Sequence, residues 1–262
     1  MRIELGGGFE VREVGSGPTL VLVHGYPLDG GMWSAVARIL SERFRVVKPD
    51  LPGRAENALP AAGTMESYAA FLDEIVRAAG GPVGLAGFSM GGYAALALLR
   101  RRPEAVRALA LVDTRAGADD DAGRTKRDEA VSDLRARGAA AAADAMVDKL
   151  LSPEARGRAD MVERVRRMIL RQKPETLESD LTAMRDRADQ TGMLSEIRVP
   201  TLVLVGELDT VTPPGPAREM ASAIPGAELV EIPGAGHLSP VEKPKLVAAA
   251  LGAFFARALP HA

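Results

Sequence analysis

The chain has 262 residues, of which 47% are hydrophobic, and this is enough for one large α/β domain with a small inserted subdomain. With 33 basic against 35 acidic residues, the net charge of −2 creates no strong field to attract nucleic acid or anionic lipid, so we expect a small, weakly charged partner. The lack of cysteine excludes disulfides, a thiol nucleophile and thiolate metal sites, and three histidines are too few for a multi-histidine metal centre.

The amino-terminal residues argue against export. Met1 to Leu5 are followed by the glycines Gly6 to Gly8 before any apolar stretch reaches the length of a signal sequence. No apolar run approaches the roughly 18 residues that a membrane-spanning helix needs. We therefore expect a soluble, cytoplasmic protein that does not act at a membrane.

The first part of the chain alternates short apolar runs with helical patterns. Residues 9–14 alternate before a Gly-Ser-Gly-Pro turn, which favours an antiparallel edge hairpin. Four later runs are typical of buried parallel strands: Thr19–Val23, Arg45–Lys48, Pro82–Phe88 and Ala108–Val112. The stretches between them predict helices at Trp33–Ser41, Met65–Ala79 and Met90–Arg102. This alternation implies right-handed crossovers and a doubly wound sheet.

A helical segment then interrupts the strand pattern. Residues 115–195 are rich in arginine and alanine, with helix starts at Ser152-Pro153 and at Pro174, and they predict an inserted cap. Two of its helices carry apolar stripes that include Met161 and Met168 on one and Met184 on the other. We expect the stripes to pack on the core, with these methionines as candidates for lining an acyl pocket, because thioethers adapt to varied apolar shapes.

Strand patterns return after the cap. Thr201–Val205 and Glu228–Ile232 are the expected strands, and a closing helix is expected over Val241–Arg257. The predicted organisation is therefore a core of residues 1–114 and 196–262 with a cap of residues 115–195 inserted in it.

One serine lies at a predicted strand-to-helix corner. Ser89 is the centre of the pentapeptide Gly87-Phe88-Ser89-Met90-Gly91, and this G-x-S-x-G pattern is typical of a nucleophile elbow. Such a tight turn needs neighbours without bulk, and the glycines around Ser89 leave that room. The helix that follows directs its N–H groups and its positive dipole end at the same corner. We predict that Ser89 is the nucleophile of an acyl transfer.

A serine hydroxyl needs a general base at neutral pH, and histidine is the usual one. His261 is the penultimate residue, where order is usually poor, and His24 follows a strand in a position suited to shaping the opposite wall of the site. His237 lies in a loop after a strand, between residues that include Gly234 and Gly236, so its ring can swing over the carboxyl edge of the sheet. His237 is the predicted base.

The base needs a carboxylate that orients it and stabilises the imidazolium. Asp209 directly follows the strand Thr201–Val205, and Ser, Asp and His then occur in the chain order typical of this triad. Asp113 also ends a strand and is the main alternative. Two further acidic residues are weaker alternatives, Glu207 and Asp50, of which Asp50 is better suited to capping a turn.

The oxyanion of a tetrahedral intermediate needs two donors. We expect the backbone N–H groups of Met90, directly after the nucleophile, and of Tyr26, in the loop after the strand that ends before His24. Candidate substrate-binding residues are Trp33 and His24 together with the cap methionines. Trp33 opens a helix and suits core packing at least as well, and His24 suits a turn-shaping role.

Five motifs occur in order, each at a predicted strand end: His24-Gly25-Tyr26-Pro27-Leu28-Asp29, Asp50-Leu51-Pro52-Gly53-Arg54, Gly87 to Gly92, Gly206-Glu207-Leu208-Asp209 and Gly236-His237. Together they resemble the motif set of the α/β-hydrolase fold over nearly the whole chain. The resemblance implies a mostly parallel, eight-stranded, doubly wound sheet with an inserted helical cap. The chain is most similar to microbial carboxylesterases with a cap, and it also resembles enol-lactone hydrolases and cofactor-free perhydrolases. Serine at the elbow disfavours haloalkane dehalogenase and epoxide hydrolase activities, because those enzymes have aspartate there.

The predicted function is hydrolysis of short to medium acyl esters through an acyl-enzyme, with no cofactor and no metal. The alternatives are a lactonase, a perhydrolase or a carbon–carbon hydrolase with the same three side chains. A ligand-binding protein that retains the fold without turnover is a further alternative of a different class.

Overall fold

The computed structural model describes residues 2–5, 9–54 and 59–259. In this part of the chain the strands form one sheet in the order β1-β2-β4-β3-β5-β6-β7-β8. Their bounds are β1 Arg2–Leu5, β2 Phe9–Val14, β3 Thr19–Val23, β4 Arg45–Val47, β5 Val83–Phe88, β6 Val106–Val112, β7 Thr201–Gly206 and β8 Glu228–Ile232. The two pairings of β2 are antiparallel and the others are parallel. The predicted mostly parallel α/β sheet is therefore confirmed.

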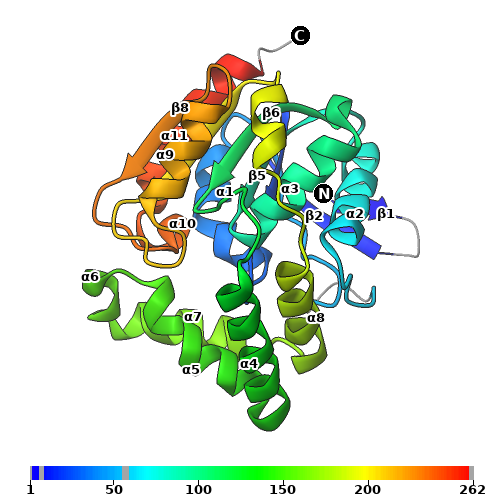
Figure 1. Cartoon of the computed structure of the whole chain (residues 1–262). Coiled ribbons are helices and arrows are strands. Elements are labelled where there is room, and N and C mark those ends of the chain that lie inside the picture. Colours follow the sequence, from blue (N-terminus) through cyan, green and yellow to red (C-terminus); the bar gives the residue numbers. More distant parts are fainter. Residues whose placement is uncertain (1, 6–8, 55–58, 260–262) are drawn as a thin grey trace.

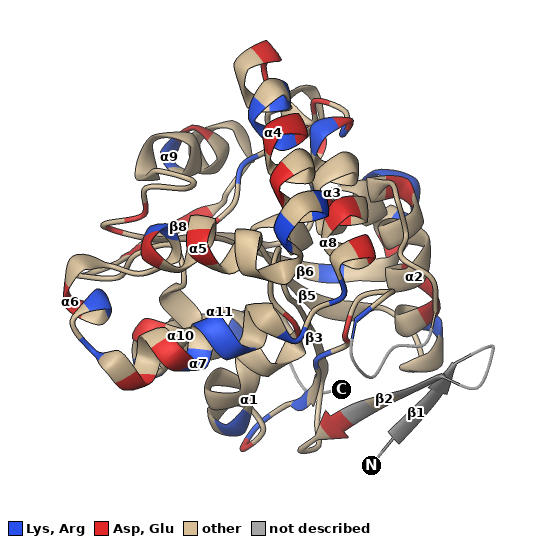
Figure 2. Ribbon diagram, turned by 90° about the horizontal axis from the view of Figure 1, so that it is seen from below, with Lys and Arg blue, Asp and Glu red and all other residues tan. Residues whose placement is uncertain are grey.

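Helices cover both faces of this sheet. The helices α1 (Ser34–Leu40) and α11 (Pro244–Ala258) pack on each other on one face, and α2 (Met65–Ala78) packs on α3 (Met90–Arg101) on the other, where α9 (Pro214–Ala223) also lies (Figure 2). The central strands β5 and β7 are buried along their whole length, because both of their faces are covered.

Five helices connect β6 to β7 and lie beyond the end of the sheet (Figure 1). They are α4 (Asp121–Arg137), α5 (Ala139–Leu150), α6 (Pro153–Arg156), α7 (Ala159–Leu170) and α8 (Pro174–Arg185). The predicted helix starts at Ser152-Pro153 and Pro174 coincide with α6 and α8, and the Ser152 side chain accepts the N–H of Ala155 at 3.2 Å. Within the expected segment 115–195 the structure is thus helical, whereas the division of the chain into core and cap domains stays a prediction.

Four features differ from the sequence predictions. The closing helix is divided into α10 (Ser239–Glu242) and α11, because Pro244 lacks the N–H that a continuous helix would use. A 3₁₀ turn, η1 (Gly30–Trp33), precedes α1 where the helix was expected to begin at Trp33. The strand β1 and the helix α9 were not predicted. The helix α9 starts with Pro-Gly-Pro, which is typical of a loop, and it is held in place by the buried side chains of Ala217 and Met220.

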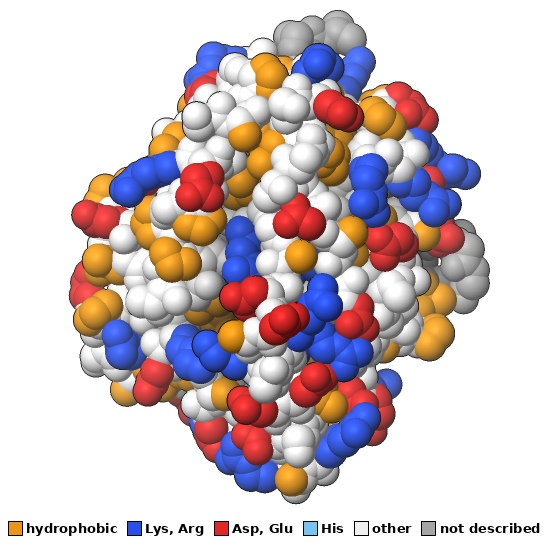
Figure 3. Space-filling view, in the orientation of Figure 1, with side chains coloured by type: hydrophobic (Ala, Val, Ile, Leu, Met, Phe, Trp, Pro, Cys, Tyr) orange, Lys and Arg blue, Asp and Glu red, His pale blue; other side chains and the backbone are white. Residues whose placement is uncertain are grey.

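No helix in the described ranges is long and apolar enough to span a membrane. On the face drawn in Figure 3, basic and acidic side chains are interspersed, as expected from the near-balance of charges in the composition.

Candidate active site

Ser89 occupies the turn between β5 and α3 in a strained backbone conformation. Its φ of 49° lies in the left-handed region, which a residue with a side chain seldom adopts. The turn is held because the Ser89 N–H donates to Val112 O at 2.9 Å and the Thr114 hydroxyl donates to Ser89 O at 2.8 Å. Only a glycine fits at position 91, since a Cβ there would lie 2.6 Å from His24 O.

The structure brings the three predicted residues of the triad together. Ser89 Oγ lies 3.1 Å from His237 Nε2, and His237 Nδ1 lies 2.8 Å from Asp209 Oδ2. The three side chains follow the ends of β5, β8 and β7, so the carboxyl edge of the parallel sheet gathers residues that are far apart in sequence. All three are buried, which shields the hydrogen bonds between them from water.

Hydrogen bonds on both oxygens of Asp209 fix its orientation. Oδ1 accepts the backbone N–H groups of Val211 at 2.7 Å and Thr212 at 2.9 Å, and Oδ2 accepts the Thr212 hydroxyl at 2.8 Å. Burial alone would raise the pKa of Asp209, but His237 and the Thr212 donors outweigh it, so this pKa lies below its ordinary value. The carboxylate is therefore ionised and aimed at His237.

Sequence reasoning missed Thr212, whose hydroxyl also lies 3.2 Å from His237 Nδ1. The signal available was that an aspartate in a turn commonly accepts backbone N–H groups of the next few residues, which brings residue 212 beside the carboxylate. Thr212 contacts both Asp209 and His237 and so helps to orient them.

The alternative carboxylates have other partners. Asp113 accepts the N–H of Gly206 at 2.7 Å and the hydroxyl of Ser239 at 2.5 Å. Burial, followed by the negative charge of Asp209, raises the pKa of Asp113 well above its ordinary value. Asp50 accepts the N–H of Gly30, and Glu207 accepts the N–H of Gly234. These contacts support backbone turns.

Of the two other histidines, only His24 is among the residues that the structure describes. His24 is fully buried, its Nε2 accepts the Leu51 N–H at 3.0 Å, and its Nδ1 lies 3.1 Å from Gly25 O. Burial, aided by the charge of Arg54, lowers the pKa of His24 to about 3, so the ring is neutral and links two loops. The structure thus places His24 in the turn-shaping position. His261 lies outside the described residues.

The two expected oxyanion donors belong to residues next to the elbow or next to a residue that contacts it. Met90 begins α3 directly after Ser89, and Gly25, next to Tyr26, is so close to the elbow that a Cβ on it would lie 3.0 Å from Ser89 Cβ. Within the described part of the chain, neither the Met90 nor the Tyr26 N–H donates a hydrogen bond. Both groups are therefore free to receive an oxyanion.

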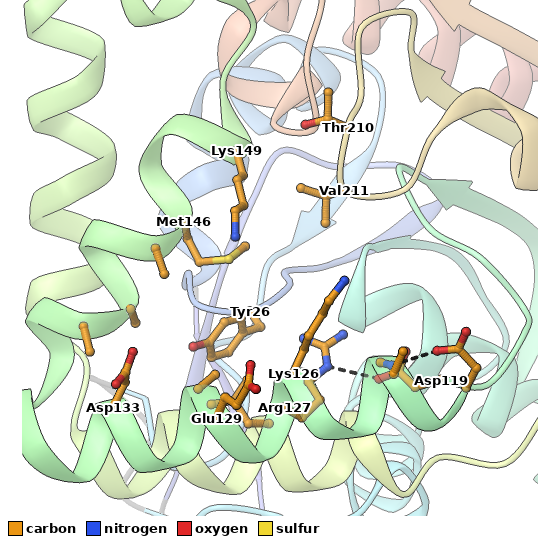
Figure 4. A pocket seen from close by; sticks show the side chains of 18 of the residues that line it. Tyr26, Asp119, Lys126, Arg127, Glu129, Asp133, Met146, Lys149, Thr210 and Val211 are labelled. Atoms are coloured by element: carbon orange, nitrogen blue, oxygen red, sulfur yellow. Dashed lines mark hydrogen bonds and ion pairs between the residues drawn. The ribbon is translucent and has the colours of Figure 1, made fainter.

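Two adjoining cavities lie over the serine. The inner one has a volume of about 40 Å³ and is lined by Ser89 and His237 together with Tyr26, Tyr93, Arg115, Arg127, Met146, Met184, Val211 and Thr212. The outer one has a volume of about 670 Å³ and extends between α4 and α5, and Figure 4 shows Tyr26 and Met146 facing into it. Tyr26, Arg115, Arg127, Met146 and Val211 line both cavities.

Only some of the expected substrate-binding residues reach this space. Met184 lines the inner cavity, whereas Trp33, Met161, Met168 and His24 line neither cavity. Trp33 is fully buried and its ring lies edge-on to Phe88 at 6.4 Å, which is core packing. Met161 and Met168 lie on the buried face of α7 and pack against the hydrophobic core.

Several lining residues were missed by sequence reasoning, among them Met146, Arg115 and Arg127. No local pattern distinguishes them from surface residues of helices and loops, because their role depends on how α4, α5 and the loop before α4 lie over the sheet. Among the residues that the structure describes, no cluster of three or more His, Asp and Glu side chains is arranged to hold a metal ion.

Comparisons with known proteins agree with this geometry. Residues 20–250 match the model of the alpha/beta hydrolase family. The pimeloyl-[acyl-carrier protein] methyl ester esterase of Chromobacterium violaceum is 31% identical, over 87% of this chain and 90% of its own length. Among solved structures, a thermophilic esterase from Thermogutta terrifontis superposes with a TM-score of 0.92 at 35% identity, covering 98% of this chain and 99% of that one.

The enol-lactonase from Burkholderia xenovorans LB400 superposes with a TM-score of 0.87 at 26% identity, covering 97% of this chain and 99% of that one. Esterases and a lactonase among the relatives support hydrolase activity. Because the family model matches most of the sequence, the chain belongs to the alpha/beta hydrolase family.

Proposed function

We propose that this chain is a serine carboxylesterase that hydrolyses short to medium acyl esters through an acyl-enzyme intermediate. The observation that carries the proposal is the continuous set of hydrogen-bond contacts from Ser89 Oγ through His237 to Asp209, facing a cavity. A hydroxyl, an imidazole and a carboxylate in this order form a catalytic triad, which makes serine nucleophilic at neutral pH.

The first half of the reaction forms the acyl-enzyme. Ser89 Oγ attacks the ester carbonyl carbon while its proton passes to His237 Nε2, and Asp209 stabilises the imidazolium that results. The negative charge on the carbonyl oxygen is taken up by the N–H groups of Met90 and Tyr26, each contributing roughly 3 kcal/mol. His237 then returns the proton to the leaving alkoxide, and the C–O bond to the alcohol breaks.

The second half repeats these steps with water as the nucleophile. His237 removes a proton from the water, the hydroxide attacks the acyl carbon, and the proton is returned to Ser89 Oγ as the acid leaves. The side chains of this chain supply every proton transfer, so the mechanism uses no cofactor.

The apolar part of the cavity wall supports a short to medium acyl group. Met146, Met184 and Val211 lie beside Ser89 and His237 in the inner cavity, and thioether side chains adapt to different acyl shapes. The outer cavity provides room for a longer group or for the alcohol.

A lactone is the second candidate substrate. The similarity to an enol-lactonase over 97% of this chain favours it, and opening a cyclic ester uses the same three side chains. In that case the alcohol formed remains part of the acyl group, and deacylation releases one molecule that carries both the acid and the hydroxyl.

The test is a Ser89→Ala variant assayed with p-nitrophenyl butyrate, beside a Ser195→Ala control at an exposed position. We expect Ser89→Ala to lose turnover by at least about 10³-fold and Ser195→Ala to retain it. Exposure to an organophosphonate should add one label per chain on Ser89, as measured by mass spectrometry. Turnover retained in Ser89→Ala would refute the mechanism, and a folded protein that takes up no label would favour the ligand-binding alternative.

A further inference from the structure

Three arginines converge on a single carboxylate at the wall of the cavity. Asp119 forms ion pairs with Arg115, with Arg127 at 3.1 Å and with Arg187 at 3.0 Å. In the described ranges no other acidic side chain forms an ion pair with any of the three, although the charge of Arg187 also helps to lower the pKa of Asp189. The group therefore carries a formal excess of two positive charges.

Asp119 is held ionised in this cluster. Its side chain is 1% exposed, and burial alone would raise its pKa, but the guanidiniums of Arg127 and Arg187 hold that pKa below its ordinary value. The single negative charge of Asp119 neutralises one of the three guanidinium charges. Two positive charges of the arginines therefore remain without a counter-charge in the cluster.

The three arginines differ in their access to the cavity. Arg187 is 3% exposed, donates to the carbonyls of Met184 and Gly117, and lies 4.3 Å from the centre of the Tyr93 ring, so it supports the wall from behind. Arg115 and Arg127 are 34% and 25% exposed and line both cavities.

Arg115 and Arg127 have donors to spare. Each uses one nitrogen for Asp119, and their remaining N–H groups make no hydrogen bond with the described residues. Arg115 and Arg127 share the lining of the inner cavity with Ser89 and His237, and no aspartate or glutamate lines that cavity. The excess positive charge therefore lies beside the serine.

Two lysines add positive charge to the outer cavity. Figure 4 shows Lys126 of α4 and Lys149 of α5 directed toward the outer cavity from opposite sides, where they raise the local concentration of anions. Besides Asp119, which pairs with the arginines, three carboxylates line the outer cavity: Asp120 just before α4, and Glu129 and Asp133 along it. An anionic group is therefore held best at Arg115 and Arg127 and less well beside Glu129 and Asp133.

We propose that the substrate hydrolysed at Ser89 carries a carboxylate, which Arg115 and Arg127 bind: it is an ester or lactone with a free acid group on its acyl or alcohol part. Guanidinium groups suit a carboxylate because their planar N–H donors match its two oxygens. The inference rests on the proposed function and deepens it by naming a class of substrate.

The experiment compares charged and neutral esters of matched shape. Monomethyl adipate and dimethyl adipate test a carboxylate on the acyl side, and 4-acetoxybutanoate and its methyl ester test one on the alcohol side. Hydrolysis is followed by pH-stat titration. We expect the wild-type kcat/KM to be at least about 10-fold higher for the anionic member of one pair, and 0.5 M NaCl to reduce this preference.

The variant Arg127→Gln tests the assignment to a residue. It leaves Asp119 paired with Arg115 and Arg187, so the fold should persist, and the anionic-to-neutral ratio of kcat/KM should fall about 10-fold. The matched control is Arg124→Gln, an exposed arginine on the same helix that lines neither cavity, and it should keep the wild-type ratio. Adipate should inhibit hydrolysis of p-nitrophenyl butyrate competitively in wild type and less in Arg127→Gln.

The outcomes separate the two proposals. Equal kcat/KM for charged and neutral esters in both pairs, or an unchanged ratio in Arg127→Gln, would overturn the carboxylate site while leaving Ser89 as the nucleophile. If the wild-type protein hydrolyses none of the esters and takes up no organophosphonate label on Ser89, the proposed function is refuted instead.

Discussion

The carboxylate of Asp209 lies 2.8 Å from Nδ1 of His237. A second buried carboxyl belongs to Asp113, and the nearby charge of Asp209 helps to raise the pKa of Asp113. Asp113 accepts hydrogen bonds from Gly206 and Ser239, whereas Asp209 faces His237. Two acidic side chains at neighbouring strand ends thus have different environments, and this difference leads to two testable roles.

Asp209→Asn should lower kcat for p-nitrophenyl butyrate by about 10³ to 10⁴-fold, because an amide in this position holds the wrong tautomer of His237 and does not stabilise the imidazolium. The measurement is steady-state kinetics with a thermal unfolding scan to verify the fold. Asp113→Asn is the control and should stay within about 3-fold of wild type. A larger loss in Asp113→Asn than in Asp209→Asn would reverse the assignment.

Asp113→Asn should gain stability relative to wild type as the pH rises. The pKa of Asp113 in the folded state lies well above its ordinary value, so the protonated acid contributes stability at low pH, and this contribution is lost as the pH rises through the folded pKa. Asparagine does not ionise, and its side-chain oxygen can still accept the N–H of Gly206. Urea unfolding at pH 5 and pH 9 measures the effect, and a difference between the two proteins that does not change with pH would contradict it.

Gly91→Ala should destabilise the fold by about 1–3 kcal/mol through overpacking. A Cβ at this position would lie 2.6 Å from His24 O and 2.7 Å from Val23 O, and backbone atoms of a central strand cannot move away. Gly192→Ala is the matched control, since nothing lies within 4 Å of its Cβ position, and it should change stability by less than about 0.5 kcal/mol. Equal unfolding free energies for the two variants would show that the elbow has more room than the structure indicates.

His24 should make the protein less stable in mild acid. Its folded pKa of about 3 lies below the unfolded value of 6.5, so its contribution is present above pH 6.5 and is lost as the pH falls toward 3. From pH 7.5 to pH 5 this one group removes about 2 kcal/mol, or about 1.36 kcal/mol per unit over roughly 1.5 units. His24→Gln should show a smaller loss over the same interval in urea unfolding. An identical pH dependence in both proteins would exclude His24 as its source.

Arg54 and Asp180 form a fully buried ion pair between the loop after β4 and α8. Arg54→Met should cost about 3–5 kcal/mol, because among the described residues it leaves the buried Asp180 carboxylate with only the Tyr68 hydroxyl as a side-chain partner. The double variant Arg54→Met, Asp180→Leu should be less destabilised than Arg54→Met alone, since no uncompensated charge remains. Urea unfolding of both variants tests this, and additive losses would show that burial of the charge is not the cause.

Much of the fold could be predicted from local patterns. The strands Thr19–Val23 and Glu228–Ile232 were predicted with the bounds that the structure has, because β-branched and other apolar residues between turn signals leave few alternatives. The helix α9 was missed because its Pro-Gly-Pro start hides a helix that only packing stabilises.

For the site, the sequence by itself determined which residue types stand at strand ends: Ser89 in its glycine-rich corner, His237 in its loop, and Asp209 and Asp113 as rival acids. Only the tertiary structure decided which acid faces His237, that Met184 lines the cavity while Met161 packs in the core, and that Arg115 and Arg127 meet at Asp119 beside the serine. The physical reason is range: strand and turn preferences act over a few neighbouring residues, whereas the meeting of distant side chains depends on the packing of the whole chain.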